Sequence, residues 1–129
     1  MDKQYLLSTF NKHFFEFCDS VKAYFSDNRD IRNSVTVLQG IKAVNPKLII
    51  KIWKSSVADL YSAQIEAKDL DFFVNKEYSN DIKDMQDNQK ILSSIDQLRT
   101  PIKEMPKEDQ EKSMQFVYNL TELSKLYFQ

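Results

Sequence analysis

The shortage of turn-forming residues constrains the fold of this chain more than any other feature. Gly40 is the only glycine among 129 residues, and there are three prolines. Tight turns between β-strands depend on such residues, and glycine in particular supplies the positive φ angles that other residues avoid. Residues that favour helices, such as Lys, Glu, Gln and Leu, are abundant. We therefore expect an all-α fold without a β-sheet.

The chain has enough hydrophobic residues for one core. Its 129 residues include nine Phe, six Tyr and one Trp, which suits a single domain that buries most of its aromatic side chains. No internal repeat or low-complexity linker divides it. We expect residues 1–129 to form one bundle of four to five helices with a monomeric core. The expected core residues are Phe10, Phe14, Phe17, Trp53, Val57, Leu60, Val117 and Leu120.

Hydrophobic residues recur every three or four positions in five segments, as they do on one face of an α-helix. The first predicted helix covers about 4–26, and the second runs from a cap at Asp27 or Asn28 to near Val44. The third runs from Pro46 through Ile65. The fourth covers about 91–98, with a kink or stop at Thr100-Pro101, and the fifth runs from Pro106 to the C-terminus. The third helix should have Asn45 as its N-cap and Pro46 as its first residue. Residues 68–88 lack this period, which predicts a short helix followed by a polar connection.

Gly40 lies inside the second predicted helix. Glycine costs about 1 kcal/mol relative to alanine in such a position. Two explanations are open: another helix approaches closely at this point, or the last turn of the helix is loosening.

A strip of lysines is the one feature that favours nucleic-acid binding. Lys47, Lys51 and Lys54 share the flank opposite the hydrophobic face of the third helix, and Lys42 lies just upstream. Lysines at this spacing can meet successive phosphates. The formal net charge is −1, and no arginine-rich or RNA-reading aromatic motif accompanies the strip. We favour the alternative that these lysines form the solvated side of an amphipathic helix, so nucleic acid is the less favoured partner.

The chain is poor in groups for catalysis. His13 is the only histidine and Cys18 the only cysteine, and the single glycine excludes a glycine-rich phosphate loop. We expect His13 at the surface or at the core boundary, and Cys18 as a small buried thiol in a reducing, intracellular compartment. We predict no enzymatic activity. Nowhere are there enough consecutive hydrophobic residues to cross a membrane, and no signal peptide is evident.

Acidic residues in the aperiodic segment could form a weak divalent-cation site. Asp81, Asp84 and Asp87 have helical spacing, and Asp69 and Asp71 precede them. The pattern lacks the central glycine and the terminal glutamate of a calcium-binding loop. We interpret these residues as a solvated acidic surface and predict neither a metal nor a cofactor.

The same segment holds the candidates for a protein interface. Phe72, Phe73 and Tyr78 lie outside the regular hydrophobic pattern, and aromatic residues on a connection can anchor a partner at low entropic cost. The alternative, which we favour, is that they pack onto the core.

Two blocks carry a resemblance that extends beyond these patterns: NPKLIIKIWKSSVADLYSAQIEAKDLDFFVNKEYSND at 45–81 and IDQLRTPIKEMPKEDQEKSMQFVYNLTELSKLYF at 95–128. They resemble small uncharacterised proteins of large nucleocytoplasmic DNA viruses that infect algae and protists. The resemblance implies a viral product in the host cytoplasm, either a virion component or a factor of the viral factory. We expect a non-enzymatic helical interaction or structural protein that binds a protein partner, with a nucleic-acid-associated factor that uses the four lysines as the alternative.

Overall fold

Helices account for all regular structure in the described part of the chain, which a computed structural model defines for residues 2–75 and 86–129. The prediction of an all-α fold is therefore confirmed. The elements are α1 (Lys3–Tyr24), α2 (Arg29–Val44), α3 (Leu48–Trp53), a π-helical turn η1 (Lys54–Ala58), α4 (Asp59–Glu66), α5 (Leu70–Asn75), α6 (Gln86–Arg99), a 3-10 helix η3 (Thr100–Glu104) and α7 (Lys107–Tyr127).

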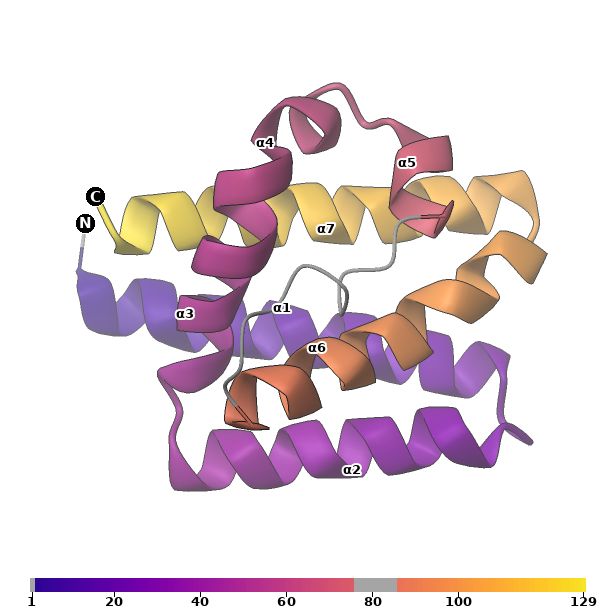
Figure 1. Ribbon diagram of the computed structural model, residues 1–129, viewed down its shortest axis with the longest axis horizontal. Helices are drawn as coiled ribbons and strands as arrows, with labels where there is room; N and C mark the ends of the chain where they lie inside the picture. Colours follow the sequence, from indigo (N-terminus) through magenta and orange to yellow (C-terminus); the bar gives the residue numbers. More distant parts are fainter. Residues whose placement is uncertain (1, 76–85) are drawn as a thin grey trace.

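The helices pack in two layers (Figure 1). Helices α2, α1 and α7 lie side by side, with successive helices of this layer running in opposite directions. The continuous run of α3, η1 and α4 crosses in front of α1 and α7, and α6 crosses in front of α1 and α2. The start of α1 and the end of α7 lie at the same end of the bundle (Figure 1).

Trp53 lies at the centre of the core, where the two layers meet. Its ring makes edge-on contacts with Phe10 and Phe14, with ring centroids 6.2 and 6.1 Å apart. Its Nε1 donates a hydrogen bond of 3.0 Å to Oγ1 of Thr121 on α7, so the one polar group of the indole is satisfied inside the core. We call these four residues the Trp53 cluster. Of the predicted core residues, Phe10, Phe14, Phe17, Trp53, Val57, Val117 and Leu120 are buried.

Leu60 is the exception, and its prediction as a core residue is wrong. Its side chain is 52% exposed. The π-helical turn at Lys54–Ala58 adds one residue to the helix, which rotates all later residues relative to a regular α-helix. Ala58 and Tyr61 therefore face the core, and Leu60 points to solvent.

The predicted helix ends agree with the structure except at Pro46 and at the start of α6, which begins at Gln86 and not near residue 91. Asn28 caps α2, since its side chain accepts a hydrogen bond of 3.1 Å from the backbone of Ile31. Asn45 similarly accepts one of 3.2 Å from the Lys47 backbone, but α3 begins only at Leu48. Pro46 lies in the preceding turn, where its carbonyl accepts a hydrogen bond of 3.0 Å from the side chain of Asn11 on α1.

The end of α6 and the start of α7 also lie at the prolines where the sequence predicts them. Helix α6 ends at Arg99 and gives way to a 3-10 helix at Thr100-Pro101, because proline lacks the N–H that would continue the helix. Pro106 directly precedes α7, whose first turn carries two acidic residues. The predicted short helix after residue 68 is α5, and the expected connection falls largely on residues 76–85, outside the described part.

Candidate functional site

The aromatic interface candidates pack mainly onto the core. Phe73 is 3% exposed, and Phe72 is half-buried with its ring 5.2 Å from that of Tyr61. The buried Arg99 on α6 fixes this segment, since its Nη1 donates a hydrogen bond of 3.0 Å to the carbonyl of Phe73. Tyr78 lies outside the described residues. Phe73 therefore packs onto the core, as we favoured from the sequence, and Phe72 does so in part.

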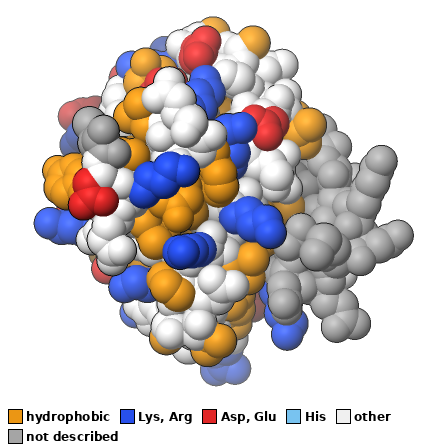
Figure 2. All heavy atoms as spheres, turned by 90° about the vertical axis from the view of Figure 1, so that its left-hand side faces the viewer, with side chains coloured by type: hydrophobic (Ala, Val, Ile, Leu, Met, Phe, Trp, Pro, Cys, Tyr) orange, Lys and Arg blue, Asp and Glu red, His pale blue; other side chains and the backbone are white. Residues whose placement is uncertain are grey.

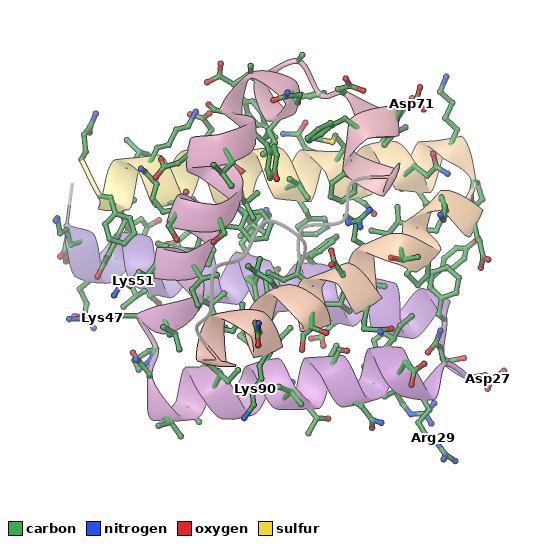
Figure 3. All side chains as sticks on the ribbon, viewed as in Figure 1. Asp27, Arg29, Lys47, Lys51, Asp71 and Lys90 are labelled. Carbon is green, nitrogen blue, oxygen red and sulfur yellow. The ribbon has the colours of Figure 1, made fainter. Side chains whose placement is uncertain are left out.

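The four lysine candidates differ in their surroundings. Lys47 and Lys51 are exposed and point off the end of the bundle where α2 meets α3 (Figure 3). Lys42 is exposed and its Nζ lies 5.8 Å from the centre of the Phe15 ring. Lys54 is half-buried and forms an ion pair with Asp59. Three of the four are therefore available at the surface.

This end of the bundle is rich in positive charge. Figure 2 looks onto it and shows hydrophobic side chains in the middle of the face with several Lys and Arg side chains around them. Neither Lys47 nor Lys51 forms an ion pair with any residue that the structure describes. An anionic group could therefore approach these two lysines without displacing a carboxylate of the described chain.

His13 lies at the core boundary, as predicted. Its ring is 4.7 Å from that of Phe116, and its Nδ1 and Nε2 lie 3.6 Å from Oε1 of Glu16 and 3.4 Å from Nδ2 of Asn119. Nε2 of Gln115 donates a hydrogen bond to Oδ1 of Asn119, and Nζ of Lys68 donates one to Oε1 of Gln115. These contacts join α1, α7 and the turn just after α4 through polar side chains.

Cys18 is a buried thiol, as predicted, with no exposed surface. Burial, with a smaller contribution from the charge of Asp19, raises the pKa of the Cys18 thiol. A nucleophilic cysteine requires the opposite shift and access to substrate. The thiol is therefore held in its unreactive form.

The acidic candidates do not come together in the described region. Asp69 uses its carboxylate to accept a hydrogen bond of 3.1 Å from the backbone of Phe72, at the start of α5. Asp71 lies on the outer side of the same helix (Figure 3). Among the described residues, no group of three or more His, Cys, Asp or Glu side chains could hold a metal ion. Asp81, Asp84 and the side chain of Asp87 lie outside the description.

The sequence patterns missed a surface on α2. The inner side of this helix buries Ile31, Val35 and Leu38, each at most 1% exposed. A second group of residues lies at helical spacing further around the helix, and we call it the outer surface of α2. It consists of Val37, Gly40, Ile41 and Val44.

The outer surface of α2 is hydrophobic and open. Val37 is 42% exposed and Val44 is 88% exposed. A Cβ atom built on Gly40 would meet no described atom within 4 Å outside its own helix and its chain neighbours. Neither explanation offered for Gly40 holds, since no helix of the described chain packs against it and α2 continues to Val44.

Two shallow hollows adjoin this surface. One has a volume of about 410 Å³ and is lined by Val37, Gly40, Ile41, Val44, Asn45, Leu48 and Lys90. The other has a volume of about 690 Å³ and is lined by Val37, Gln89, Lys90, Ser93 and Ser94. Helix α6 thus forms one wall of a groove along α2, and Gly40 widens the groove because it has no side chain.

Comparisons with known proteins do not constrain the function of this surface. In the described ranges, no helix is long and hydrophobic enough to cross a membrane. The chain matches no protein-family model, no curated protein and no solved structure.

Proposed function

We propose that this chain is a non-enzymatic helical interaction or structural protein, and that it binds a protein partner through the outer surface of α2. The observation that carries the proposal is the pair of hydrophobic sides on one helix. The inner side is buried in the core, whereas Val37 and Val44 remain exposed on either side of Gly40. No contact within the described chain requires a glycine at this position.

The energetics favour an occupied outer surface. Full burial of one valine side chain contributes about 1.5 kcal/mol or more, and Val44 retains 88% of its accessible surface in the isolated chain. Gly40 weakens α2 without a described packing benefit within the chain. Both features become favourable when a protein backbone approaches α2 closely. The outer surface of α2 therefore supports a protein contact better than the Phe72 region does.

A charge placed on this surface tests the proposal. Val44→Lys should abolish binding of partner proteins captured by the tagged chain, because it puts an ammonium group into the contact. Gln39→Lys is the matched control, since Gln39 is an exposed residue of α2 outside the outer surface. If both variants capture the same proteins as the wild type, the proposal is wrong. The viral resemblance implies that the capture should use infected host cells and purified virions.

A nucleic-acid-associated function is the second candidate, and the exposed pair Lys47 and Lys51 supports it (Figure 3). Phosphate contacts release counterions, so the affinity for duplex or single-stranded nucleic acid would fall steeply with salt. Fluorescence anisotropy at several salt concentrations measures this dependence. Tight, salt-dependent binding that Lys47→Glu and Lys51→Glu abolish, and that Val44→Lys leaves unchanged, would favour this candidate over the protein-binding proposal.

A further inference from the structure

We infer that the end of the bundle from which Lys47 and Lys51 project docks onto an anionic lipid membrane as a peripheral contact. We call this surface the basic end, and it also carries the start of α1 and the end of α7 (Figures 1 and 3). The inference goes beyond the proposed function and does not depend on the outer surface of α2. Two features carry it: lysines without acidic partners, and exposed hydrophobic side chains between the cations (Figure 2).

Three exposed lysines supply the free positive charge of the basic end. Lys3, Lys47 and Lys51 form no ion pair with any residue in 2–75 or 86–129. The acidic residue next to them in sequence is Asp2, whose carboxylate accepts a hydrogen bond of 2.9 Å from the backbone of Gln4. Three cations beside one such acid attract an anionic partner.

Hydrophobic side chains at the same end remain in solvent. Tyr5 near the start of α1 and both Leu126 and Phe128 at the end of α7 are at least 40% exposed. The rings of Tyr127 and Phe128 lie 4.9 Å apart, and Nζ of Lys3 lies 5.6 Å from the centre of the Tyr127 ring. A lysine of α1 is therefore directly beside the aromatic residues of α7.

This combination suits a lipid surface. Aromatic and aliphatic side chains enter the boundary between headgroups and acyl chains, while the lysine ammonium groups stay at the level of the headgroup phosphates. Leu126 fits such a boundary but cannot stack on a nucleic-acid base as an aromatic ring does. The contact requires no helix that spans the membrane.

The positions of the arginines favour lipid over nucleic acid. Arginine binds phosphate through a planar fork, which makes it the preferred cation for nucleic-acid recognition. All three arginines of the chain lie away from the basic end. Arg29 is at the opposite end of the bundle (Figure 3), Arg32 donates a hydrogen bond of 2.6 Å to the carbonyl of Ser26, and Arg99 is buried.

Vesicle flotation of the intact chain tests the contact. The two surfaces compared are phosphatidylcholine alone and phosphatidylcholine with about 30% phosphatidylserine. Three lysines near an anionic surface should make binding to the second about a hundredfold stronger. Binding should weaken between roughly 0.05 and 0.5 M salt, because salt screens the charges. A chain that floats with neither vesicle, or equally with both, overturns the inference.

Charge variants test which surface touches the vesicle. The double variant Lys47→Glu/Lys51→Glu should lose most of the binding to anionic vesicles. The matched control is Lys103→Glu/Lys107→Glu, which makes the same charge change at exposed positions at the opposite end of the bundle. It should bind as the wild type does. Equal losses in the two double variants would mean that net charge alone drives binding, and would overturn the inference.

Hydrophobic variants test the centre of the basic end. Tyr5→Ser and Phe128→Ser should each weaken vesicle binding by about fivefold, because an exposed ring no longer enters the lipid. Circular dichroism and the fluorescence of the buried Trp53 check that each variant remains folded. If neither variant weakens binding, the contact uses charge alone and the inferred docking is wrong.

The remaining outcomes separate a membrane from the other partners. Binding of duplex or single-stranded nucleic acid without vesicle flotation overturns the inference and favours the nucleic-acid candidate. Val44→Lys should still bind anionic vesicles, because the basic end keeps its lysines. If this variant floats but no longer captures a protein partner, the inference and the proposed function both stand, on separate surfaces. If it floats and still captures the same proteins, only the proposed function falls.

Discussion

The Trp53 cluster and the outer surface of α2 are both hydrophobic, but the chain completes only the first. In the Trp53 cluster, aromatic rings from α1 surround the indole, and Thr121 satisfies its N–H. On the outer surface of α2, two valines remain exposed beside a glycine with no packing neighbour in the described chain. The difference separates residues that determine folding from residues that remain available for association.

This separation predicts that the two regions respond to substitution in different assays. Changes in the Trp53 cluster should lower the free energy of unfolding. Changes on the outer surface of α2 should alter association and leave the folded chain nearly as stable as before. The following predictions test this division, from the largest expected effect to the smallest.

Trp53→Ala should have the largest effect on stability. It creates a cavity between Phe10 and Phe14 and leaves the Thr121 hydroxyl without the indole N–H. Removal of a buried tryptophan side chain costs about 3–5 kcal/mol, and urea unfolding followed by circular dichroism measures the loss. Val44→Ala is the comparison from the outer surface of α2 and should change the free energy of unfolding by less than about 0.5 kcal/mol. Equal losses would contradict the division.

Arg99→Ala should be the next most damaging substitution. The guanidinium is buried, donates to the carbonyl of Phe73 and lies 3.3 Å from Oδ1 of Asp96. Its removal takes away the hydrogen bond to the Phe73 carbonyl and the contact with Asp96, which costs about 2–4 kcal/mol. Arg99→Lys keeps the charge but loses the planar fork, so it should lie between the wild type and Arg99→Ala. Amide hydrogen exchange in α5 should accelerate in both variants; unchanged exchange would show that Arg99 does not fix this helix.

Cys18 should make stability decrease at alkaline pH. Burial raises the pKa of the Cys18 thiol in the folded chain, whereas the pKa of a thiol in the unfolded chain is about 8.5. Above that pH the unfolded state releases a proton that the folded state retains, so the free energy of unfolding falls by about 1.4 kcal/mol per pH unit, or about 2 kcal/mol at pH 10. Urea unfolding between about pH 7 and 10 measures this slope. Cys18→Ala should have a shallower slope; parallel curves would contradict the assignment to Cys18.

The sequence predicts the Trp53 cluster much better than the outer surface of α2, and the reason is physical. Periodic hydrophobic residues indicate which side of a helix is buried, and this suffices for Phe10, Phe14 and Trp53. The same periodicity fails at Leu60, because a π-helical turn changes the register and local sequence does not reveal it.

Contacts between distant segments were harder to predict. The burial of Phe73 depends on Arg99 from another helix, a pairing that spacing along the chain does not indicate. The outer surface of α2 can be recognised only when the positions of the neighbouring helices are known. The exposure of Val44 follows from where α1, α3 and α6 pack, and the sequence does not give these positions. Gly40 was the available signal, because a glycine inside a helix requires an explanation.

Gly40→Ala should have the smallest effect on stability. The sign of the change in the free energy of unfolding tests whether Gly40 serves the fold or a contact on the outer surface of α2. The new methyl group would meet no described atom within 4 Å, and the position already has helical geometry, so alanine should fit without strain. Alanine is favoured over glycine within helices by about 0.5–1 kcal/mol, so the variant should unfold at a higher urea concentration than the wild type. A protein partner that approaches α2 closely at Gly40 would meet the same methyl group, so capture of the partner should weaken. A variant that is both more stable and less associated would show that the glycine is retained for contact and not for folding, whereas a less stable variant would mean that it serves the fold.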